Sequence, residues 1–195
     1  MRIIIFVMLI SFNLFSQKVE NDSLNNKFDY ELAYYGINFS NRNFVGLKFP
    51  HVNKEDINGN LFESNNSKRL VLYNFWKKSC APCIAETDML NQLESKFSKE
   101  VDFVGITYEN KDDILKFNLK HPFHFRQLSI SENIITNLFI YSGYPATFLV
   151  FDGEIIAFSS GGVEDSKTKL YYVSLYNTYS VFRTAIEKKL KEIEK

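Results

Sequence analysis

Three features are scarce or absent in this sequence: net charge, a long apolar segment and cysteine. Its 195 residues carry 23 basic and 23 acidic side chains. This balance leaves no net field to attract nucleic acid or an anionic membrane surface, so we expect no nucleic-acid partner. A chain of this length that is 45% hydrophobic can still bury one ordinary core, and we expect one folded domain.

The apolar segment at the start of the chain is too short to favour a membrane-spanning helix. Arg2 precedes an apolar run over residues 3–15, which Ser11 and Asn13 interrupt. A spanning helix needs roughly 18 apolar residues, whereas a basic start and a short apolar run are typical of a secretory signal peptide. We therefore predict a signal peptide over residues 1–16, with a membrane anchor as the alternative. No cysteine near its end could accept a lipid, so no stable membrane insertion is expected after cleavage.

The only two cysteines, Cys80 and Cys83, are separated by two residues. A disulfide that closes so short a loop stabilises a fold much less than one that closes a long loop, so the pair points to redox chemistry. The alternative is half of a zinc site, which would need four ligands. The chain has no second cysteine pair, and its three histidines lack the usual ligand spacing. We expect no metal and no cofactor.

The cysteine pair stands between a predicted strand and a predicted helix. Residues 70–76 form a near-continuous apolar run of strand length, and apolar residues recur at helical spacing from Pro82 to Phe97. This junction places the first sulfur beside the unpaired N–H groups of a helix N-terminus, where a thiolate is favoured. We predict that Cys80 is the exposed nucleophile and that Cys83 resolves the mixed disulfide. Pro82 suits the first helical turn, which needs no N–H from it.

The rest of the chain alternates strands and helices. Residues 17–42 show no clean periodicity and are interpreted as a loosely ordered arm, which leaves residues 43–195 as the folded domain. A hairpin is expected to open this domain, with residues 45–52 and 61–62 joined by an Asn-Gly turn. Further strands are predicted at residues 101–107, 123–130, 146–151 and 154–159, and helices at residues 112–119, 131–140 and from about 169 or 176 to 195. This order predicts an α/β fold.

Three segments together carry a family resemblance. Residues 71–76, the Cys-Ala-Pro-Cys motif at 80–83 and the Tyr-Pro-Ala-Thr-Phe-Leu segment at 144–149 resemble the TlpA/ResA branch of the thioredoxin-like family, over about residues 45–195. The resemblance implies a thioredoxin-like fold, in which helices flank a central mixed β-sheet, with an N-terminal β-hairpin and a βα insertion. It implies an exported, periplasmic enzyme that reduces or exchanges protein disulfides and is recharged by an unidentified thiol electron donor.

The resemblance also implies roles for individual residues. Pro145 matches a cis-proline that lies against the cysteine pair, and the backbone of Tyr144 would then be free to pair with an extended partner segment. An ordinary turn proline is the alternative. Glu86 matches a buried glutamate that exchanges a proton with Cys83, and burial would raise the pKa of its carboxyl toward neutrality. The alternative for Glu86 is an exposed acid that favours the helix N-terminus.

One departure from the family pattern concerns the residues before the first cysteine. Many relatives carry tryptophan there, whereas this chain has Lys77, Lys78 and Ser79. We assign Trp76, the nearest tryptophan, and Pro82 to the substrate-contacting group with Tyr144 and Pro145. The two lysines could lower the pKa of the Cys80 thiol or could be a solvated loop face, and they are left outside the site.

Two other functions are compatible with the motifs. A non-catalytic binding module would keep the fold and use its groove to recognise peptides. A thiol peroxidase would oxidise one cysteine to sulfenic acid and resolve it with another. The intact cysteine pair favours a thiol-disulfide oxidoreductase over both.

Overall fold

The computed structural model describes residues 44–160 and 169–195. Residues 43–195 form one compact unit. The predicted signal peptide over residues 1–16 and the arm over residues 17–42 lie outside the described residues. Within the described parts of the chain, no helix combines the length and the apolar character needed to cross a bilayer.

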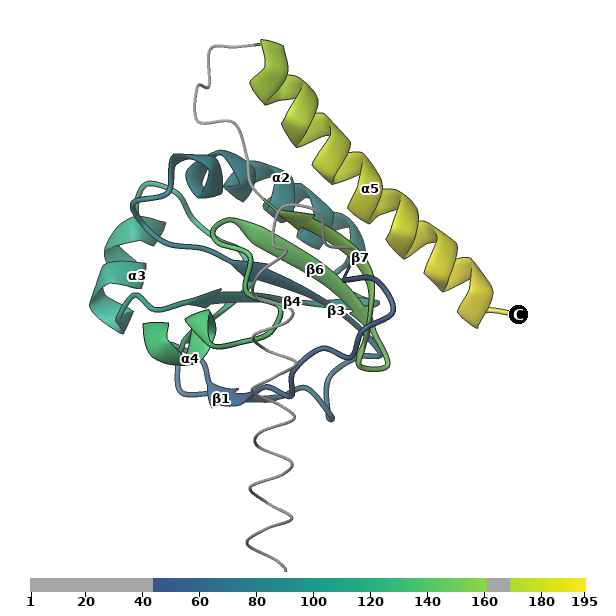
Figure 1. Ribbon diagram of the computed structural model, residues 1–195, viewed down its shortest axis with the longest axis horizontal. Helices are drawn as coiled ribbons and strands as arrows, with labels where there is room; N and C mark the ends of the chain where they lie inside the picture. Colours follow the sequence, from purple (N-terminus) through teal and green to yellow (C-terminus); the bar gives the residue numbers. More distant parts are fainter. Residues whose placement is uncertain (1–43, 161–168) are drawn as a thin grey trace, which may run out of the picture. The chain divides into compact units, whose positions relative to one another are not determined.

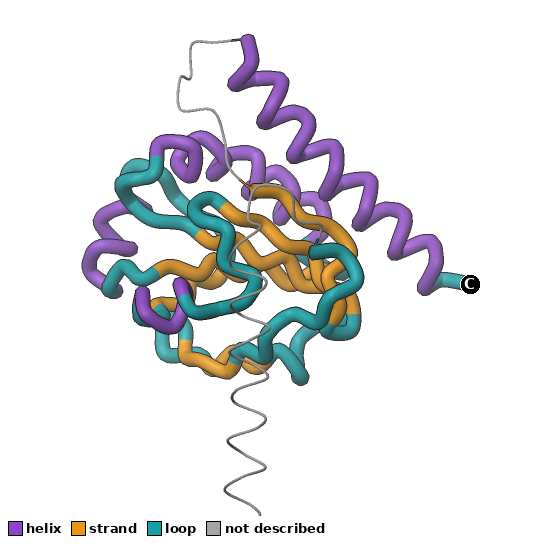
Figure 2. The backbone as a smooth tube through the Cα atoms, viewed as in Figure 1, coloured by secondary structure: helices purple, strands orange, loops and turns teal. Residues whose placement is uncertain are grey.

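The domain is built on a five-stranded mixed sheet with the strand order β5-β4-β3-β6-β7, and a separate two-stranded sheet pairs β1 with β2 (Figures 1 and 2). β3 is parallel to β4, which is parallel to β5, whereas β6 and β7 are antiparallel to their neighbours. In chain order the elements are β1 (Asn53–Glu55), β2 (Leu61–Glu63), β3 (Leu70–Phe75), α2 (Ala81–Phe97), β4 (Val101–Thr107), α3 (Lys111–Asn118), β5 (Arg126–Ser129), α4 (Glu132–Thr136), β6 (Ala146–Phe151), β7 (Glu154–Ser160) and α5 (Lys169–Ile193). The predicted thioredoxin-like α/β fold is confirmed.

The central strand β3 explains why the core has two halves. Every residue of β3 is buried, as expected of a strand covered on both faces. Because side chains alternate across a strand, Leu70 and Leu72 belong to one hydrophobic cluster and Val71 and Tyr73 to the other. The sheet therefore separates two cores, and the apolar run in the sequence supplies both.

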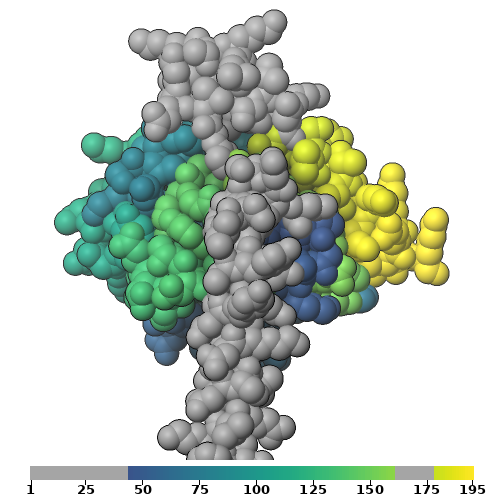
Figure 3. Space-filling view, in the orientation of Figure 1, coloured from purple at the N-terminus to yellow at the C-terminus, as the bar shows by residue number. Residues whose placement is uncertain are grey.

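Helices α2 and α5 cover one face of the sheet (Figure 1). The buried side of α2 includes Leu90 and Leu93, and Phe182 and Ile186 of α5 join the same cluster. An ion pair between Lys96 and Glu187, with 2.7 Å between Nζ and Oε1, links the outer sides of the two helices. The described surface of α5 is yellow in Figure 3.

Aromatic side chains fill the opposite face, beside α4 and the chain that leads into β1. Phe49 stacks on Tyr73 with ring centroids 4.1 Å apart, and its edge meets Phe148 at 5.6 Å. Phe44 also packs edge-on against Phe148 at 5.8 Å. Such edge-to-face and offset pairs are the favoured geometries of aromatic rings, so this half of the core is tightly ordered.

Two predicted elements differ from the structure. The predicted hairpin strand over residues 45–52 does not pair with β2, since β1 begins only at Asn53. Residues 46–49 instead run beside β7, where the N–H of Gly46 donates to the carbonyl of Ile155 at 2.8 Å. The predicted helix over residues 131–140 is also too long, because α4 ends at Thr136. Apolar residues after it, among them Ile140, are buried as irregular chain rather than as helix.

The predicted Asp-Gly turn is confirmed, whereas the loop with Asn58 and Gly59 is not a tight turn, because residues 56–60 separate β1 from β2 and only Gly59 of the pair has a positive φ. Gly59 lies between β1 and β2 with φ of 86°, and Asp152 and Gly153 join β6 to β7 with φ of 47° and 76°. Consecutive positive φ angles are the signature of the hairpin turns that match strand twist, and Asp-Gly adopts them readily. The side chain of Asp152 also pairs with Arg69, which precedes β3.

We expect Phe148→Ala to destabilise the domain by about 3–5 kcal/mol, because the ring is fully buried among other aromatic rings and its removal leaves a cavity. Urea unfolding followed by far-ultraviolet circular dichroism would measure this change in free energy. Leu119→Ala, at a position 85% exposed, is the matched control and should change stability by less than about 0.5 kcal/mol. Equal effects of the two substitutions would contradict this assignment of the core.

Candidate active site

The cysteine pair lies where β3 gives way to α2. The N–H of Trp76 still donates to the carbonyl of Ile106 on β4 at 3.0 Å, after which the chain leaves the sheet. A short turn follows, closed by a hydrogen bond of 3.2 Å from the N–H of Cys80 to the carbonyl of Lys77. Cys80 is the N-cap residue of α2, with extended backbone angles. The predicted strand-turn-helix context of the motif is therefore confirmed.

Cys80 and Cys83 are joined by a disulfide with an S–S distance of 2.15 Å and 5.2 Å between the Cα atoms. The backbone N–H of Cys83 points at Sγ of Cys80 over 3.2 Å. In the reduced protein this N–H and the helix dipole would stabilise a thiolate on Cys80. The geometry thus favours Cys80 as the more acidic sulfur of the pair.

The exposure of Cys80 differs from the prediction. Cys80 is only 6% exposed and Cys83 is 2% exposed, so the expectation of an exposed first cysteine is wrong for the disulfide-bonded protein. Both residues belong to the hydrophobic cluster under α2. Cys80 is the more exposed residue of the two and is followed by Ala81, which is exposed.

Glu86 lies one turn after Cys83 on the inner side of α2. It is 4% exposed, and its Oε2 is buried without a hydrogen-bond partner among the described residues. Burial disfavours the charged carboxylate and raises the pKa of Glu86 from 4.5 to about 8. The predicted burial is confirmed, and the alternative of an exposed acid is excluded. The proton-exchange role stays a prediction.

Pro145 precedes β6, and the Tyr144–Pro145 peptide bond is cis, as predicted. The register pairs Phe75 of β3 with Ala146 of β6, so the start of β6 faces the chain that leads to Cys80. Tyr144 also meets this loop, since Nζ of Lys77 lies 5.7 Å from the centre of its ring. The sheet thereby brings together two segments that are about 70 residues apart in the sequence.

Three residues assigned to substrate contact are buried, namely Trp76, Pro82 and Pro145. Trp76 is 0% exposed, with its ring 4.6 Å from Phe117 and 5.0 Å from Phe123. Its indole N–H donates to Oε1 of Gln127 at 2.8 Å. The prediction that Trp76 contacts substrate is therefore wrong, because apolar rings and an internal acceptor fully satisfy it. Pro82 is buried in the first turn of α2, and its contact with the substrate stays a prediction.

A glycine makes the indole hydrogen bond of Trp76 feasible. Gly105 of β4 lies opposite Gln127 of β5 in the register. A Cβ at position 105 would lie 2.1 Å from Oε1 of Gln127, the atom that accepts the indole N–H. The missing side chain thus leaves the room in which Gln127 reaches across to Trp76.

A charged group that the sequence motifs do not reveal lies at the same edge of the sheet. Glu109 follows β4, is 5% exposed, and accepts the backbone N–H of Lys78 at 3.0 Å. Nζ of Lys78 also lies 3.2 Å from Oε2 of Glu109, so Lys78 is not simply a solvated lysine. The sequence does contain a feature that could have predicted this contact. The carboxyl ends of parallel strands meet at one edge of a sheet, so an acidic residue after β4 can reach the loop after β3.

The described residues contain no group of three or more histidine, cysteine or acidic side chains that could hold a metal ion. The two sulfurs, which a zinc site would use as ligands, are bonded to each other.

Comparison with known proteins agrees with this geometry. The profile described as the AhpC/TSA family matches residues 45–159. No curated protein matches the sequence closely enough to count as a relative. Among solved structures, a thiol:disulfide interchange protein DsbE from Chlorobium tepidum is 21% identical with a TM-score of 0.55, covering 67% of this chain and 97% of its own. The thioredoxin domain of a thiol-disulfide oxidoreductase from Bacteroides vulgatus is 22% identical with a TM-score of 0.57, covering 72% and 99%. These likenesses establish the fold.

We expect Glu86 to make the protein less stable as the pH rises. Its pKa is about 8 in the folded chain and near 4.5 when unfolded, so the unfolded chain binds fewer protons between these values. The protonated carboxyl contributes fully to the free energy of unfolding below about pH 4.5, and this contribution is lost by about pH 8. Its size is on the order of 3–5 kcal/mol. In Glu86→Gln this part of the pH dependence should disappear.

Urea unfolding between pH 5 and pH 9 would measure this dependence. Asp88→Asn, an exposed position on the same helix, is the matched control and should keep the wild-type slope. A Glu86→Gln protein with the same slope as the wild type would contradict the raised pKa of Glu86.

Proposed function

We propose that this chain, which belongs to the AhpC/TSA family, is an exported thiol-disulfide oxidoreductase that reduces or exchanges disulfides in envelope proteins. The proposal rests on one observation. The Cys80–Cys83 disulfide lies at the start of α2, at the sheet edge where cis-Pro145 precedes β6. A pair of sulfurs placed in this way can take up and release two electrons without a cofactor. The predicted signal peptide over residues 1–16 supports export to the periplasm.

The reaction runs through a mixed disulfide. In the reduced protein the Cys80 thiolate attacks one sulfur of a substrate disulfide, forms a bond to it, and expels the other substrate sulfur as a thiolate. The Cys83 thiolate then attacks Sγ of Cys80 and expels the first substrate sulfur. The substrate gains two electrons, and the enzyme is left with the Cys80–Cys83 disulfide found in the structure. A thiol donor must return two electrons for the next cycle.

Glu86 supplies a place for the proton that Cys83 must lose. The pKa of Glu86 is raised to about 8, close to that of an ordinary thiol, so transfer between the two groups needs little free energy. Its carboxylate form takes the proton from the Cys83 thiol, and the acid returns it to solvent or to the departing substrate thiolate. Burial at 4% exposure keeps bulk water from competing for this exchange.

The partner segment docks in an extended form beside Tyr144. The ladder between β3 and β6 begins at Ala146, which leaves Tyr144 just outside it. The backbone of Tyr144 can therefore pair with a substrate chain in the manner of an added strand. Such pairing recognises the backbone of the substrate segment rather than its side chains, which suits an enzyme that acts on disulfides in several proteins. Pro145, which precedes β6, is buried, and its contact with the substrate stays a prediction.

We expect wild-type protein to accelerate insulin reduction by dithiothreitol, and Cys80→Ser and Cys83→Ser to fall to the uncatalysed rate, because each removes one half of the dithiol. Turbidity of precipitated insulin chains measures the rate. Cys83→Ser should also accumulate mixed disulfides with substrate on Cys80, whereas Cys80→Ser should not.

Three outcomes separate this proposal from its alternatives. Background rates in all three proteins would favour a binding module without redox activity. Peroxide consumption that depends on Cys80 and exceeds insulin reduction would favour a thiol peroxidase. Retention of full insulin reductase activity by Cys80→Ser would remove the assigned nucleophile.

A further inference from the structure

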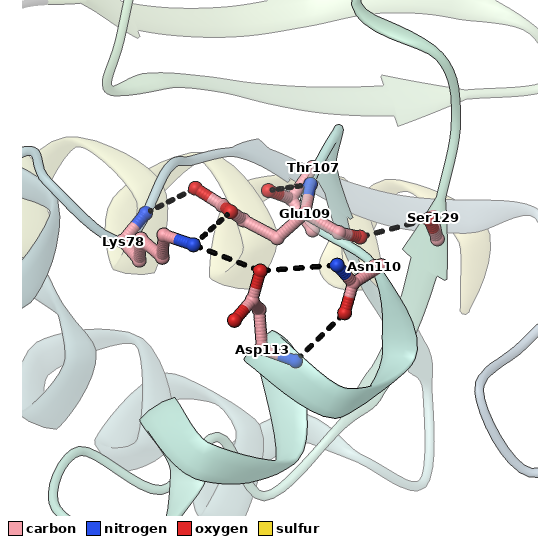
Figure 4. Close-up of polar contacts among 6 residues, drawn as sticks. All are labelled: Lys78, Thr107, Glu109, Asn110, Asp113 and Ser129. Carbon is pink, nitrogen blue, oxygen red and sulfur yellow. Dashed lines mark hydrogen bonds and ion pairs between the residues drawn. The ribbon is translucent and has the colours of Figure 1, made fainter.

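A polar cluster joins the loop before Cys80 to the end of β4 (Figure 4). Lys78 contributes two donors to one carboxylate: its backbone N–H lies 3.0 Å from Oε1 of Glu109, and its Nζ lies 3.2 Å from Oε2. The same ammonium lies 2.8 Å from Oδ2 of Asp113 on α3. Glu109 therefore holds Lys78 by its main chain and by its side chain at once.

Glu109 is itself tied to the sheet. Its N–H donates to Oγ1 of Thr107 at 3.2 Å, and its carbonyl accepts from Oγ of Ser129 at 2.8 Å. The residue is 5% exposed, whereas the side chain of Asp113 is 27% exposed. Of the two acids that meet Lys78, Glu109 is thus the buried one, with its backbone bonded to residues of β4 and β5.

The loop before Cys80 has few other links to the body of the protein. The N–H of Trp76 donates to Ile106 at the end of the sheet, and the N–H of Cys80 donates to Lys77 within the loop. Between these two bonds, the N–H of Lys78 is held by Glu109. Hydrogen bonds to an ionised acceptor are among the stronger ones in proteins. Glu109 accordingly fixes the backbone two residues before the reactive sulfur.

The cluster also places opposite charges near Cys80. Lys78 stands two residues before Cys80 in a turn closed by the bond between Cys80 and Lys77, so Lys78 and the Glu109 carboxylate that contacts it lie on the order of 10 Å from the Cys80 sulfur. A carboxylate at that distance disfavours a thiolate, and an ammonium favours it. Other titratable groups around the loop include Lys77 on the loop itself, Tyr108 after β4, Tyr144 before β6, Cys83 and Glu86 on α2, and Asp113 on α3.

We propose that Glu109 is a positioning residue for the redox site, which holds the Cys80 loop through the N–H of Lys78 and balances the Lys78 charge beside the Cys80 thiol. This inference rests on the proposed oxidoreductase function and adds a part of the site that the cysteine motif does not contain. Lys78 and Glu109 carry opposite charges. Removing the Glu109 charge should therefore lower the alkylation midpoint of Cys80, and removing the Lys78 charge should raise it.

Three variants of the full chain test both halves of the proposal. Glu109→Gln removes the charge but keeps an oxygen that can accept the N–H of Lys78. Lys78→Met removes the ammonium and keeps the N–H. Glu109→Ala removes the charge and the acceptor together. The readouts are the pH dependence of iodoacetamide alkylation of Cys80 in the reduced protein and the hydrogen exchange of the Lys78 amide.

We expect the alkylation midpoint to fall by roughly 0.5–1 pH unit in Glu109→Gln and to rise by a similar amount in Lys78→Met. The Lys78 amide should exchange at least about tenfold faster in Glu109→Ala and within about threefold of wild type in Glu109→Gln. Midpoints that move in the same direction, or do not move, would overturn the charge balance. Unchanged exchange in Glu109→Ala would overturn the positioning role.

Asp112→Asn is the matched control, because it removes an exposed carboxylate from α3 one residue before the one that meets Lys78. It should leave the midpoint within about 0.2 pH unit of wild type. A shift as large as that of Glu109→Gln would show that net charge alone is responsible and would overturn the proposal. Alkylation needs no disulfide substrate, so a wild type that fails to reduce insulin would contradict the proposed function without deciding this test.

Discussion

The pairing of β3 with neighbours of opposite direction is the constraint on which the site depends. Because β4 runs parallel to β3, the carboxyl ends of the two strands meet at one edge of the sheet. Because β6 runs antiparallel, its amino end meets the same edge. The register of Phe75 with Ile106 and with Ala146 therefore gathers the cysteine loop, Glu109 and cis-Pro145. A change in any of these registers would separate groups that the chemistry needs together.

Two buried glutamates, Glu86 on α2 and Glu109 after β4, have opposite surroundings. Glu86 has an oxygen without a hydrogen-bond partner among the described residues, so burial raises its pKa into the range where thiols exchange protons. Glu109 is as deeply buried but meets an ammonium and a backbone N–H, both from Lys78. The first arrangement suits a group that gains and loses a proton. The second suits a group that holds a loop in place.

Predictions from the local sequence are correct where the residues of an element specify that element by themselves. Three elements form as predicted because their own residues meet their backbone or burial requirements. They are the buried strand at residues 70–75, the amphipathic helix α2 and the Asp-Gly turn after β6. The predicted pairing of residues 45–52 is wrong because the residues of an extended segment do not specify which strand it pairs with. The segment could pair with the next extended piece or with β7, and only the packed aromatic layer under the sheet selects β7.

The sequence by itself determined the cysteine pair at a strand-helix junction and the order of strands and helices, since these depend on local spacing and backbone preference. The family resemblance added the thioredoxin-like fold and the cis-proline that precedes β6. Only the tertiary structure decided that Trp76 is a core residue, that Cys80 is largely covered in the disulfide form, and that Glu109 reaches Lys78. Burial and charge pairing depend on which distant segments lie opposite each other. Sheet register sets those neighbours, and no single stretch of the sequence contains it.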